Sequence, residues 1–269
     1  MLGSLLITLR EGLEAALIIG IILAYLVKTN NRQGLKPVWL GTALAVLVSL
    51  IAGAIIYAVA GEFSGQAEQI FEGSAMLLAV GVLTWMVFWM RKQAVNIKGE
   101  LQAQIQSALT SGSAFALASI AFIAVVREGI ETVLFLFAAN TVAESAVSFT
   151  IGGLLGLVIA ITIGYGVYKG SSKLNLRTFF NITGLVLIIF AAGLLAHGIH
   201  EYNEAAIIPN VIEHVYDINA ILPEKSTFGN FLTALFGYNG NPSLTEIIGY
   251  IGYLAWALVA YFRPAAAKA

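Results

Sequence analysis

The amino-acid sequence predicts an all-α protein that crosses a membrane several times, and three observations carry this prediction. Of the 269 residues, 59% are hydrophobic and 11% are charged, whereas soluble domains average about 25% charged residues. Residues 37–61, 73–90 and 145–168 contain no charged residue, and about 20 mainly apolar residues suffice for a helix to cross the hydrocarbon core. The 14 basic and 15 acidic residues nearly cancel, which argues against a nucleic-acid partner.

Four further segments have a similar apolar density and complete a prediction of seven transmembrane helices. They are residues 2–27, 114–138, 179–200 and 244–262. Between the third and fourth spans, residues 98–109 carry an aliphatic residue at every fourth position, which predicts a short helix on the inner membrane surface or an ordinary connector. Residues 202–242 are too apolar for a loose loop, so we expect short helices over the outer mouth. Ser243 and Glu246 have the spacing of a capping box that opens the last helix.

The positions of the charged residues predict the orientation of these helices. Basic residues gather in cytoplasmic loops, and eleven of the 14 lysines and arginines follow the first, third, fifth and seventh spans. These are Lys28, Arg32, Lys36, Arg91, Lys92, Lys98, Lys169, Lys173, Arg177, Arg263 and Lys268. Ten acidic residues and the single base Lys225 fall on the other side. The acids are Glu62, Glu68, Glu72, Glu144, Glu201, Glu204, Glu213, Asp217, Glu224 and Glu246. The N-terminus is therefore expected outside and the C-terminus inside.

A five-residue motif occurs twice inside the predicted membrane helices. Residues 10–14 read Arg-Glu-Gly-Leu-Glu, and residues 127–131 read Arg-Glu-Gly-Ile-Glu. The two helices run in opposite directions and lie three spans apart, which is typical of an inverted repeat. We therefore expect a single transmembrane domain over residues 1–269. Its predicted parts are a first three-helix repeat (1–92), a cytoplasmic connector (93–113), a second repeat (114–201), an outer helical loop (202–243) and a seventh helix (244–262).

The charged side chains of the two motifs cannot face lipid, because one ion at the bilayer centre already costs at least about 2.5–3.5 kcal/mol. Within each motif the arginine and the second glutamate are four residues apart and share a helix face, so an ion pair is expected. Such pairs could be purely structural, but they leave Glu11 and Glu128 unexplained. Two arginines against four glutamates leave an excess of negative charge that invites a cation or protons. Because the chain has no cysteine, a hard cation bound by carboxylate oxygens fits best.

With these motifs, the sequence resembles the high-affinity iron permease family of fungi and bacteria, the oxidase-dependent iron transporters, over essentially the whole chain. The family has an Arg-Glu-x-x-Glu motif in the first and fourth of seven membrane helices, matched here by Arg10, Glu11 and Glu14 and by Arg127, Glu128 and Glu131. The stretch 236–244 before the last helix is also similar. The resemblance implies a multi-pass protein of the bacterial cytoplasmic membrane that transports ferric iron, formed outside by a ferroxidase or haem-peroxidase partner.

A second set of acidic and histidine side chains is predicted at the outer ends of helices. Glu68 and Glu72 are four residues apart near the start of the third span, and His197 and Glu201 share a face at the end of the sixth. These side chains could attract cations and pass them to the buried glutamates. Solvated helix-end acids and a structural histidine are the competing interpretations.

The sequence thus predicts an iron permease, not an enzyme, in which iron is the substrate and no cofactor is required. The predicted metal ligands are Glu11, Glu14, Glu128, Glu131, Glu68, Glu72, His197 and Glu201, and Arg10 and Arg127 balance their charge. Three alternatives remain open. One is a permease for ferrous iron, manganese or lead, since carboxylates select weakly among such metals. The others are a membrane-embedded metalloenzyme using zinc at the outer residues and a proton-linked exporter of organic cations.

Overall fold

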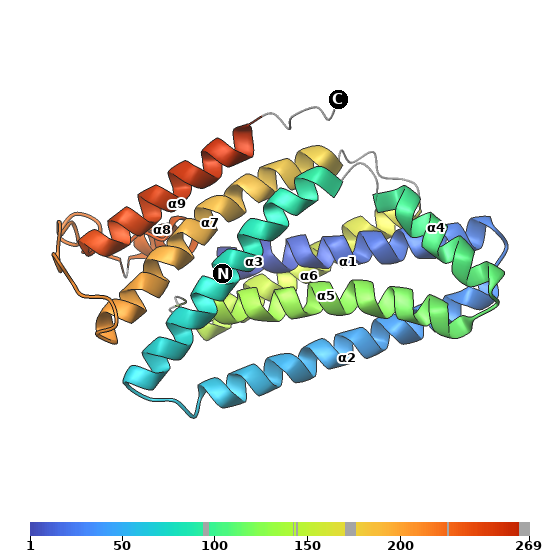
Figure 1. Cartoon of the computed structure of the whole chain (residues 1–269), viewed down its shortest axis with the longest axis horizontal. Coiled ribbons are helices and arrows are strands. Elements are labelled where there is room, and N and C mark those ends of the chain that lie inside the picture. Colours follow the sequence, from blue (N-terminus) through green and yellow to red (C-terminus); the bar gives the residue numbers. More distant parts are fainter. Residues whose placement is uncertain (94–96, 142, 144, 170–175, 225, 264–269) are drawn as a thin grey trace. The chain divides into compact units, whose positions relative to one another are not determined.

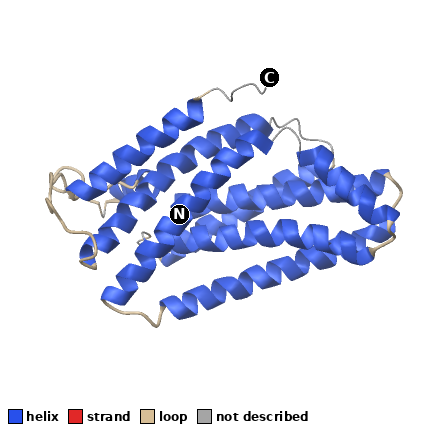
Figure 2. Ribbon diagram, in the orientation of Figure 1, coloured by secondary structure: helices blue, strands red, loops and turns tan. Residues whose placement is uncertain are grey.

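The protein is built from helices. The computed structural model describes residues 1–93, 97–141, 143, 145–169, 176–224 and 226–263, and all regular structure in these residues is helical (Figures 1 and 2). The α-helices are α1 (Leu2–Lys28), α2 (Leu35–Ala60), α3 (Gln66–Gln93), α4 (Ile97–Thr110), α5 (Ala114–Thr141), α6 (Ala146–Tyr168), α7 (Leu176–Glu204), α8 (Thr227–Phe236) and α9 (Leu244–Phe262). Four residues of the predicted charge distribution lie outside the described residues: Glu144, Lys173, Lys225 and Lys268.

Every predicted long helix is confirmed as a helix, and most ends agree within a few residues. Five segments are long and apolar enough to cross a membrane: Arg32–Ala60, Gln66–Met90, Ala146–Gly166, Asn181–Glu204 and Leu244–Phe262. Helices α1 and α5 have 27 and 28 residues, which is also sufficient length at about 1.5 Å per residue. They differ from these five in that each carries the three charged residues of a motif in its interior.

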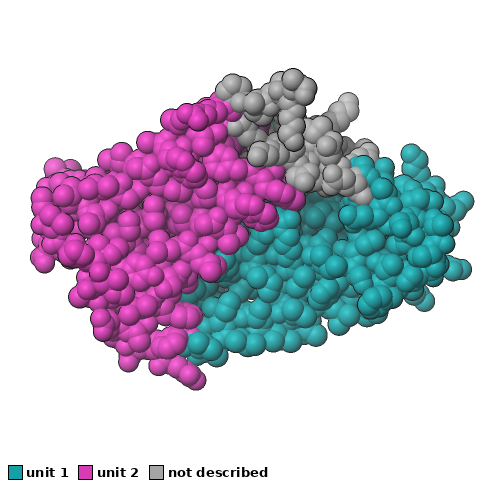
Figure 3. Space-filling view, in the orientation of Figure 1, with its two compact units in different colours: residues 1–59, 92–137, 145–179 teal, residues 60–91, 138–144, 180–269 magenta. Residues whose placement is uncertain are grey.

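The chain forms two compact units (Figure 3). The first comprises residues 1–59, 92–137 and 145–179, and the second comprises residues 60–91, 138–144 and 180–269. Helices α1, α2, α4, α5 and α6 thus lie in the first unit, and α3, α7, α8 and α9 in the second. Each predicted three-helix repeat is divided between the two units. Both copies of the charged motif lie in the first unit.

Two helix interfaces organise the first unit, α1 against α6 and α2 against α5. At the first, hydroxyl groups of α1 donate to backbone carbonyls of α6: Ser4 Oγ to Phe149 O at 2.7 Å and Thr8 Oγ1 to Gly153 O at 2.8 Å. At both interfaces glycines allow the backbones to come close, as is common between membrane helices. The close pairs are Gly152 with Met1, Gly12 with Ala160 and Gly164 with Ala16 at α1–α6, and Gly41 with Ala118, Gly129 with Ser49 and Gly53 with Val133 at α2–α5.

Close packing at the α2–α5 interface leads to a testable expectation for Gly41. A methyl group at this position would overlap the backbone carbonyl of Ala118, and a backbone atom cannot rotate away. We expect Gly41→Ala to lower the free energy of unfolding by about 1–3 kcal/mol, the usual cost of overpacking. Gly252→Ala in α9 is the matched control, because nothing lies within 4 Å of the added methyl group. Thermal unfolding of the detergent-purified variants measures the difference, and a Gly41→Ala protein as stable as the control would contradict this packing.

Helix α4 confirms the predicted short amphipathic helix between the third and fourth spans. It covers Ile97–Thr110, and its residues Leu101 and Ile105 are buried in a hydrophobic cluster of the first unit. Leu109 packs against the same cluster. The apolar positions at spacing four therefore form a face that packs against protein.

The second unit is held together by α3, α7 and α9. Helices α3 and α7 approach closely at Gly73 and Gly198, where a methyl group on Gly73 would lie 3.2 Å from Glu201 Cβ. Helix α9 begins with the predicted capping box of Ser243 and Glu246, and near its other end Tyr261 OH donates to Asn181 O at 3.0 Å.

The segment between α7 and α9 contains less helix than predicted. Within its described residues only Thr227–Phe236 form an α-helix, capped by Ser226 at its start and by Gly237, with φ of 64°, at its end. The preceding residues are irregular and are held by backbone hydrogen bonds, Val215 N to Pro242 O at 3.1 Å and Ile218 N to Gly240 O at 2.9 Å. Prolines at 209 and 223 interrupt helix formation there. The expectation of several short helices was therefore wrong for most of this segment.

Candidate metal centre

Helix α1 carries the first charged motif on its buried side. Arg10, Glu11 and Glu14 have side chains that are at most 5% exposed. The guanidinium of Arg10 reaches both glutamates, with Nη1 at 2.6 Å from Glu11 Oε1 and Nη2 at 2.9 Å from Glu14 Oε1. The predicted pair at spacing four is thus present, and Arg10 also binds the adjacent glutamate.

Helix α5 carries the second motif in a looser arrangement. Arg127 Nε donates to Glu131 Oε1 at 2.9 Å and lies 3.8 Å from Glu128 Oε1. The Arg127 side chain is 33% exposed, whereas that of Glu128 is 4% exposed. The predicted pair at spacing four is present here too, but the contact of Arg127 with Glu128 is longer than that of Arg10 with Glu11.

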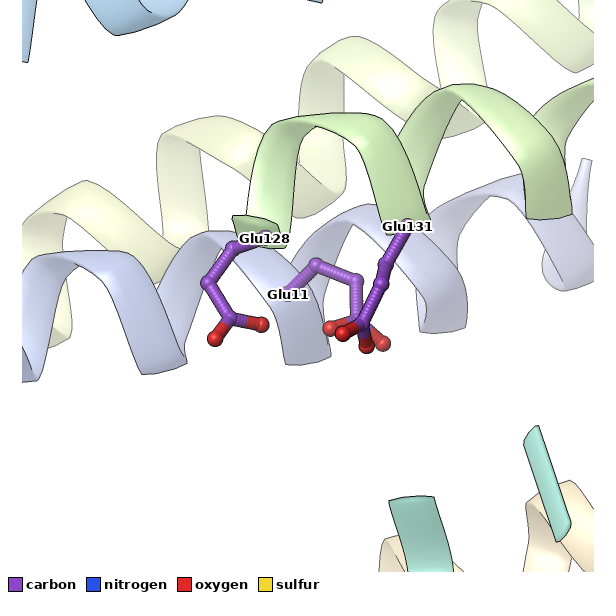
Figure 4. A group of neighbouring side chains, drawn as sticks. All are labelled: Glu11, Glu128 and Glu131. Carbon is purple, nitrogen blue, oxygen red and sulfur yellow. The ribbon is translucent and has the colours of Figure 1, made fainter. Parts of the chain in front are cut away.

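Three of the predicted carboxylates converge between these helices. Glu11 of α1 and Glu128 and Glu131 of α5 each offer an oxygen atom, and these atoms all lie within 4.8 Å of one another. Figure 4 shows the three side chains directing their carboxylates to the same region. In each, the Oε2 atom is buried without a hydrogen-bond partner. Burying such an atom is costly, and a bound cation would compensate it.

The fourth predicted carboxylate, Glu14, is not a member of this close group. It lies near one helical turn beyond Glu11 and is bound to Arg10. The donor set of the group consists of carboxylate oxygens, which suit a hard cation. Ligand oxygens within 4.8 Å of one another can contact one ion, because metal–oxygen bonds are about 2.0–2.6 Å long.

The motif glycines pack against neighbouring helices. A methyl group on Gly12 would lie 3.0 Å from Ala160 Cβ of α6, and one on Gly129 would overlap the side chain of Ser49 of α2. Both residues lie within continuous helices. The glycines therefore place α1 and α5 close to their neighbours and fix where the adjacent glutamates lie.

The predicted outer residues lie in the second unit. Glu68 is exposed, whereas Glu72, His197 and Glu201 are half-buried. His197 Nδ1 lies 3.0 Å from Gly193 O of its own helix. Glu72 and Glu201 flank the close approach of α3 and α7 at Gly73. Within the described part of the chain, these residues do not form a group with ligand atoms as close as those of the motif carboxylates.

One buried carboxylate was predicted only as a helix cap. Glu246, 3% exposed, lies 3.1 Å from His200 Nδ1 and accepts from Asn239 Nδ2 at 2.8 Å. His200 Nε2 in turn lies 3.2 Å from Glu204. The capping-box pattern indicated the position of Glu246 in α9, but no local pattern pairs it with a histidine 46 positions earlier.

Charged carboxylates buried between long apolar helices are typical of membrane proteins that conduct or transport ions. The comparison with known proteins identifies the class: residues 1–266 match the iron permease FTR1 family, and the chain belongs to this family. The predicted resemblance is confirmed.

Several curated relatives match almost the full length. The chain is 40% identical to the ferrous iron permease EfeU of Escherichia coli O6:H1 (strain CFT073) over 266 residues, which cover 98% of this chain and 96% of the relative. It is 40% identical to the ferrous iron permease EfeU of Yersinia pestis over 261 residues, covering 96% and 92%. No solved structure shows a significant match. The chain is therefore a multi-pass inner-membrane protein of an iron permease family.

Proposed function

We propose that this protein imports iron through the group formed by Glu11, Glu128 and Glu131. The observation that carries the proposal is the convergence of three buried carboxylates from α1 and α5, each with an unpartnered oxygen. Three carboxylates would neutralise a trivalent ion, and Arg10 and Arg127 balance charge when no ion is bound. Family membership supports iron as the ion.

We further propose seven transmembrane helices, with α1 and α5 added to the five apolar spans and the N-terminus outside. The placement of basic residues after alternate spans supports this orientation. The motif charges of α1 and α5 then lie within the membrane, where contacts with each other compensate them.

The proposed topology is an inverted repeat, and the glycine contacts support it. The shift along the sequence that carries Arg10 onto Arg127 also carries Met1, Gly12 and Ala16 onto Ala118, Gly129 and Val133. A second common shift carries Gly41, Ser49 and Gly53 onto Gly152, Ala160 and Gly164. Together the two shifts exchange each close pair at α2–α5 with one at α1–α6. In Figure 1 the ribbons of α1 and α5 run in opposite directions, as a pseudo-two-fold axis in the membrane plane requires.

The proposed transported form is ferric iron, produced outside by a ferroxidase or haem-peroxidase partner. Carboxylate-only ligation favours a small, highly charged ion. The relatives are named ferrous iron permeases, which makes direct transport of ferrous iron the second candidate. Glu68, Glu72, His197 and Glu201 are proposed to attract the cation before it reaches the buried group.

Flux into proteoliposomes tests this function. We expect radiolabelled ferric citrate to accumulate at least about tenfold above protein-free vesicles, a difference of about 1.4 kcal/mol in the corresponding barrier. Iron kept ferrous by ascorbate, manganese and an organic amine are offered in parallel. Ferrous flux without ferric flux would select the second candidate, and amine flux without iron flux would refute an iron permease.

A further inference from the structure

The two charged motifs have the same pattern but different structures. Arg10 is 2% exposed and binds Glu14, which is not in the close carboxylate group. Arg127 is 33% exposed and binds Glu131 through Oε1, while Glu131 Oε2 remains without a hydrogen-bond partner. The second glutamate of one motif is thus in the close group and that of the other is not, although Glu14 Oε1 is also buried without a hydrogen-bond partner.

The two second glutamates lie on opposite sides of the first ones. Glu14 follows Glu11 toward the C-terminal end of α1, and Glu131 follows Glu128 toward the C-terminal end of α5. A step of three residues moves about 4.5 Å along a helix axis. Because α1 and α5 are antiparallel (Figure 1), these steps point in opposite directions. With the N-terminus outside, Glu131 lies on the outer side and Glu14 on the inner side.

We propose that Glu131 and Glu14 bind the ion in turn, while Glu11 and Glu128 hold it throughout. This inference rests on the proposed function of the group as the iron site. The structure corresponds to the outer arrangement, in which Glu131 completes the group and Arg10 retains Glu14. In the inner arrangement the ion contacts Glu14, and Glu131 keeps only Arg127, which it already contacts through Oε1 at 2.9 Å in the outer arrangement.

The pseudo-two-fold relation gives this exchange its physical basis. It interchanges Glu11 with Glu128, Glu14 with Glu131, and Arg10 with Arg127. The inner arrangement is thus the outer one with the roles of the two motifs swapped, as in carriers whose inverted halves exchange conformations. The ion keeps three carboxylates in both arrangements. The charge near it changes little during transfer, which keeps the electrostatic cost of the step low in a medium of low dielectric constant.

The face of the membrane from which bound iron can be removed tests the proposal. Oriented proteoliposomes are loaded with radiolabelled ferric iron, and an impermeant chelator is applied to one face at a time. We expect Glu14→Gln to release iron to the outer chelator at least about tenfold faster than to the inner one. Glu131→Gln should show the opposite preference, and neither should support net uptake. Glu213→Gln, the same change at an exposed residue, should release iron as the unmodified protein does.

Each further outcome decides between hypotheses. Release to the same face by Glu14→Gln and Glu131→Gln, or loss of bound iron by both, would overturn the alternation and indicate one symmetric site. Glu11→Gln removes a shared carboxylate and should lose bound iron from both faces. If Glu11→Gln instead held iron as the unmodified protein does, the proposed iron site itself would be wrong. If the glutamine variants do not fold, Glu14→Asp and Glu131→Asp take their place, because they keep the charge and only shorten the side chain. These two variants should show the same opposite preferences for the outer and the inner chelator.

Discussion

Glu128→Gln is expected to abolish iron uptake, by more than about a hundredfold, the upper range for changes next to a bound metal. Glutamine has nearly the shape of glutamate but lacks the negative charge that a hard cation requires. Glu128 Oε2 is buried without a hydrogen-bond partner, and Glu128 Oε1 lies 3.8 Å from Arg127 Nε. Replacing it removes one negative charge from a buried acidic group while Arg127 keeps its 2.9 Å contact with Glu131, so the free energy of unfolding should be unchanged or increased. Uptake per molecule of membrane-inserted protein and thermal unfolding measure the two effects.

Comparing Glu11→Gln with Glu128→Gln separates two effects, the loss of iron uptake and the loss of stability from a broken ion pair. It should abolish uptake as Glu128→Gln does, but it also removes the 2.6 Å contact with Arg10. A buried arginine that loses a close carboxylate partner destabilises the fold, so this variant should unfold more easily than Glu128→Gln. The exposed Glu213→Gln serves as the control. Normal uptake by both motif variants would show that the carboxylate group is not the transport site.

Much of the fold could be predicted from composition because membrane helices must be apolar and long. The uncharged run 73–90 placed a helix correctly but missed its first turns, since α3 begins at Gln66. Those turns are polar: Gln66 Nε2 donates to Ala205 O at 2.8 Å and Gln69 Nε2 to Glu204 at 2.8 Å. Hydropathy cannot detect a helical segment that is stabilised by contacts with another helix.

The candidate site could be predicted in its residue types but only partly in its geometry. Spacing of four residues predicts the pairs of Arg10 with Glu14 and of Arg127 with Glu131, because helix periodicity fixes them. It does not predict that Arg10 also binds Glu11, which depends on rotamers in a packed environment. Nor does it show which carboxylates meet, because that depends on how closely α1 and α5 approach their neighbours at the motif glycines.

The second large effect is expected from replacing the motif arginines by lysine, because Arg10 is buried and Arg127 is one-third exposed. Arg10→Lys should lower the free energy of unfolding by about 3 kcal/mol, near the lower end of the cost of breaking a buried ion pair. Two separate nitrogen atoms of Arg10 contact Glu11 and Glu14, and the single ammonium of lysine cannot reproduce this fork. Arg127→Lys should cost less than about 1 kcal/mol, because the side chain is one-third exposed and solvent screens its ion pair.

Thermal unfolding and uptake of the two lysine variants, measured side by side, separate charge from geometry. Both keep the positive charge, so a purely charge-balancing role predicts equal stability and normal uptake. A role for the arginine fork predicts a larger fall in melting temperature for Arg10→Lys and lost uptake in both variants, since each arginine must release one glutamate and retain it later. Equal shifts in melting temperature would contradict the structural difference between the two motifs, and normal uptake by Arg10→Lys would reduce that arginine to a counter-ion.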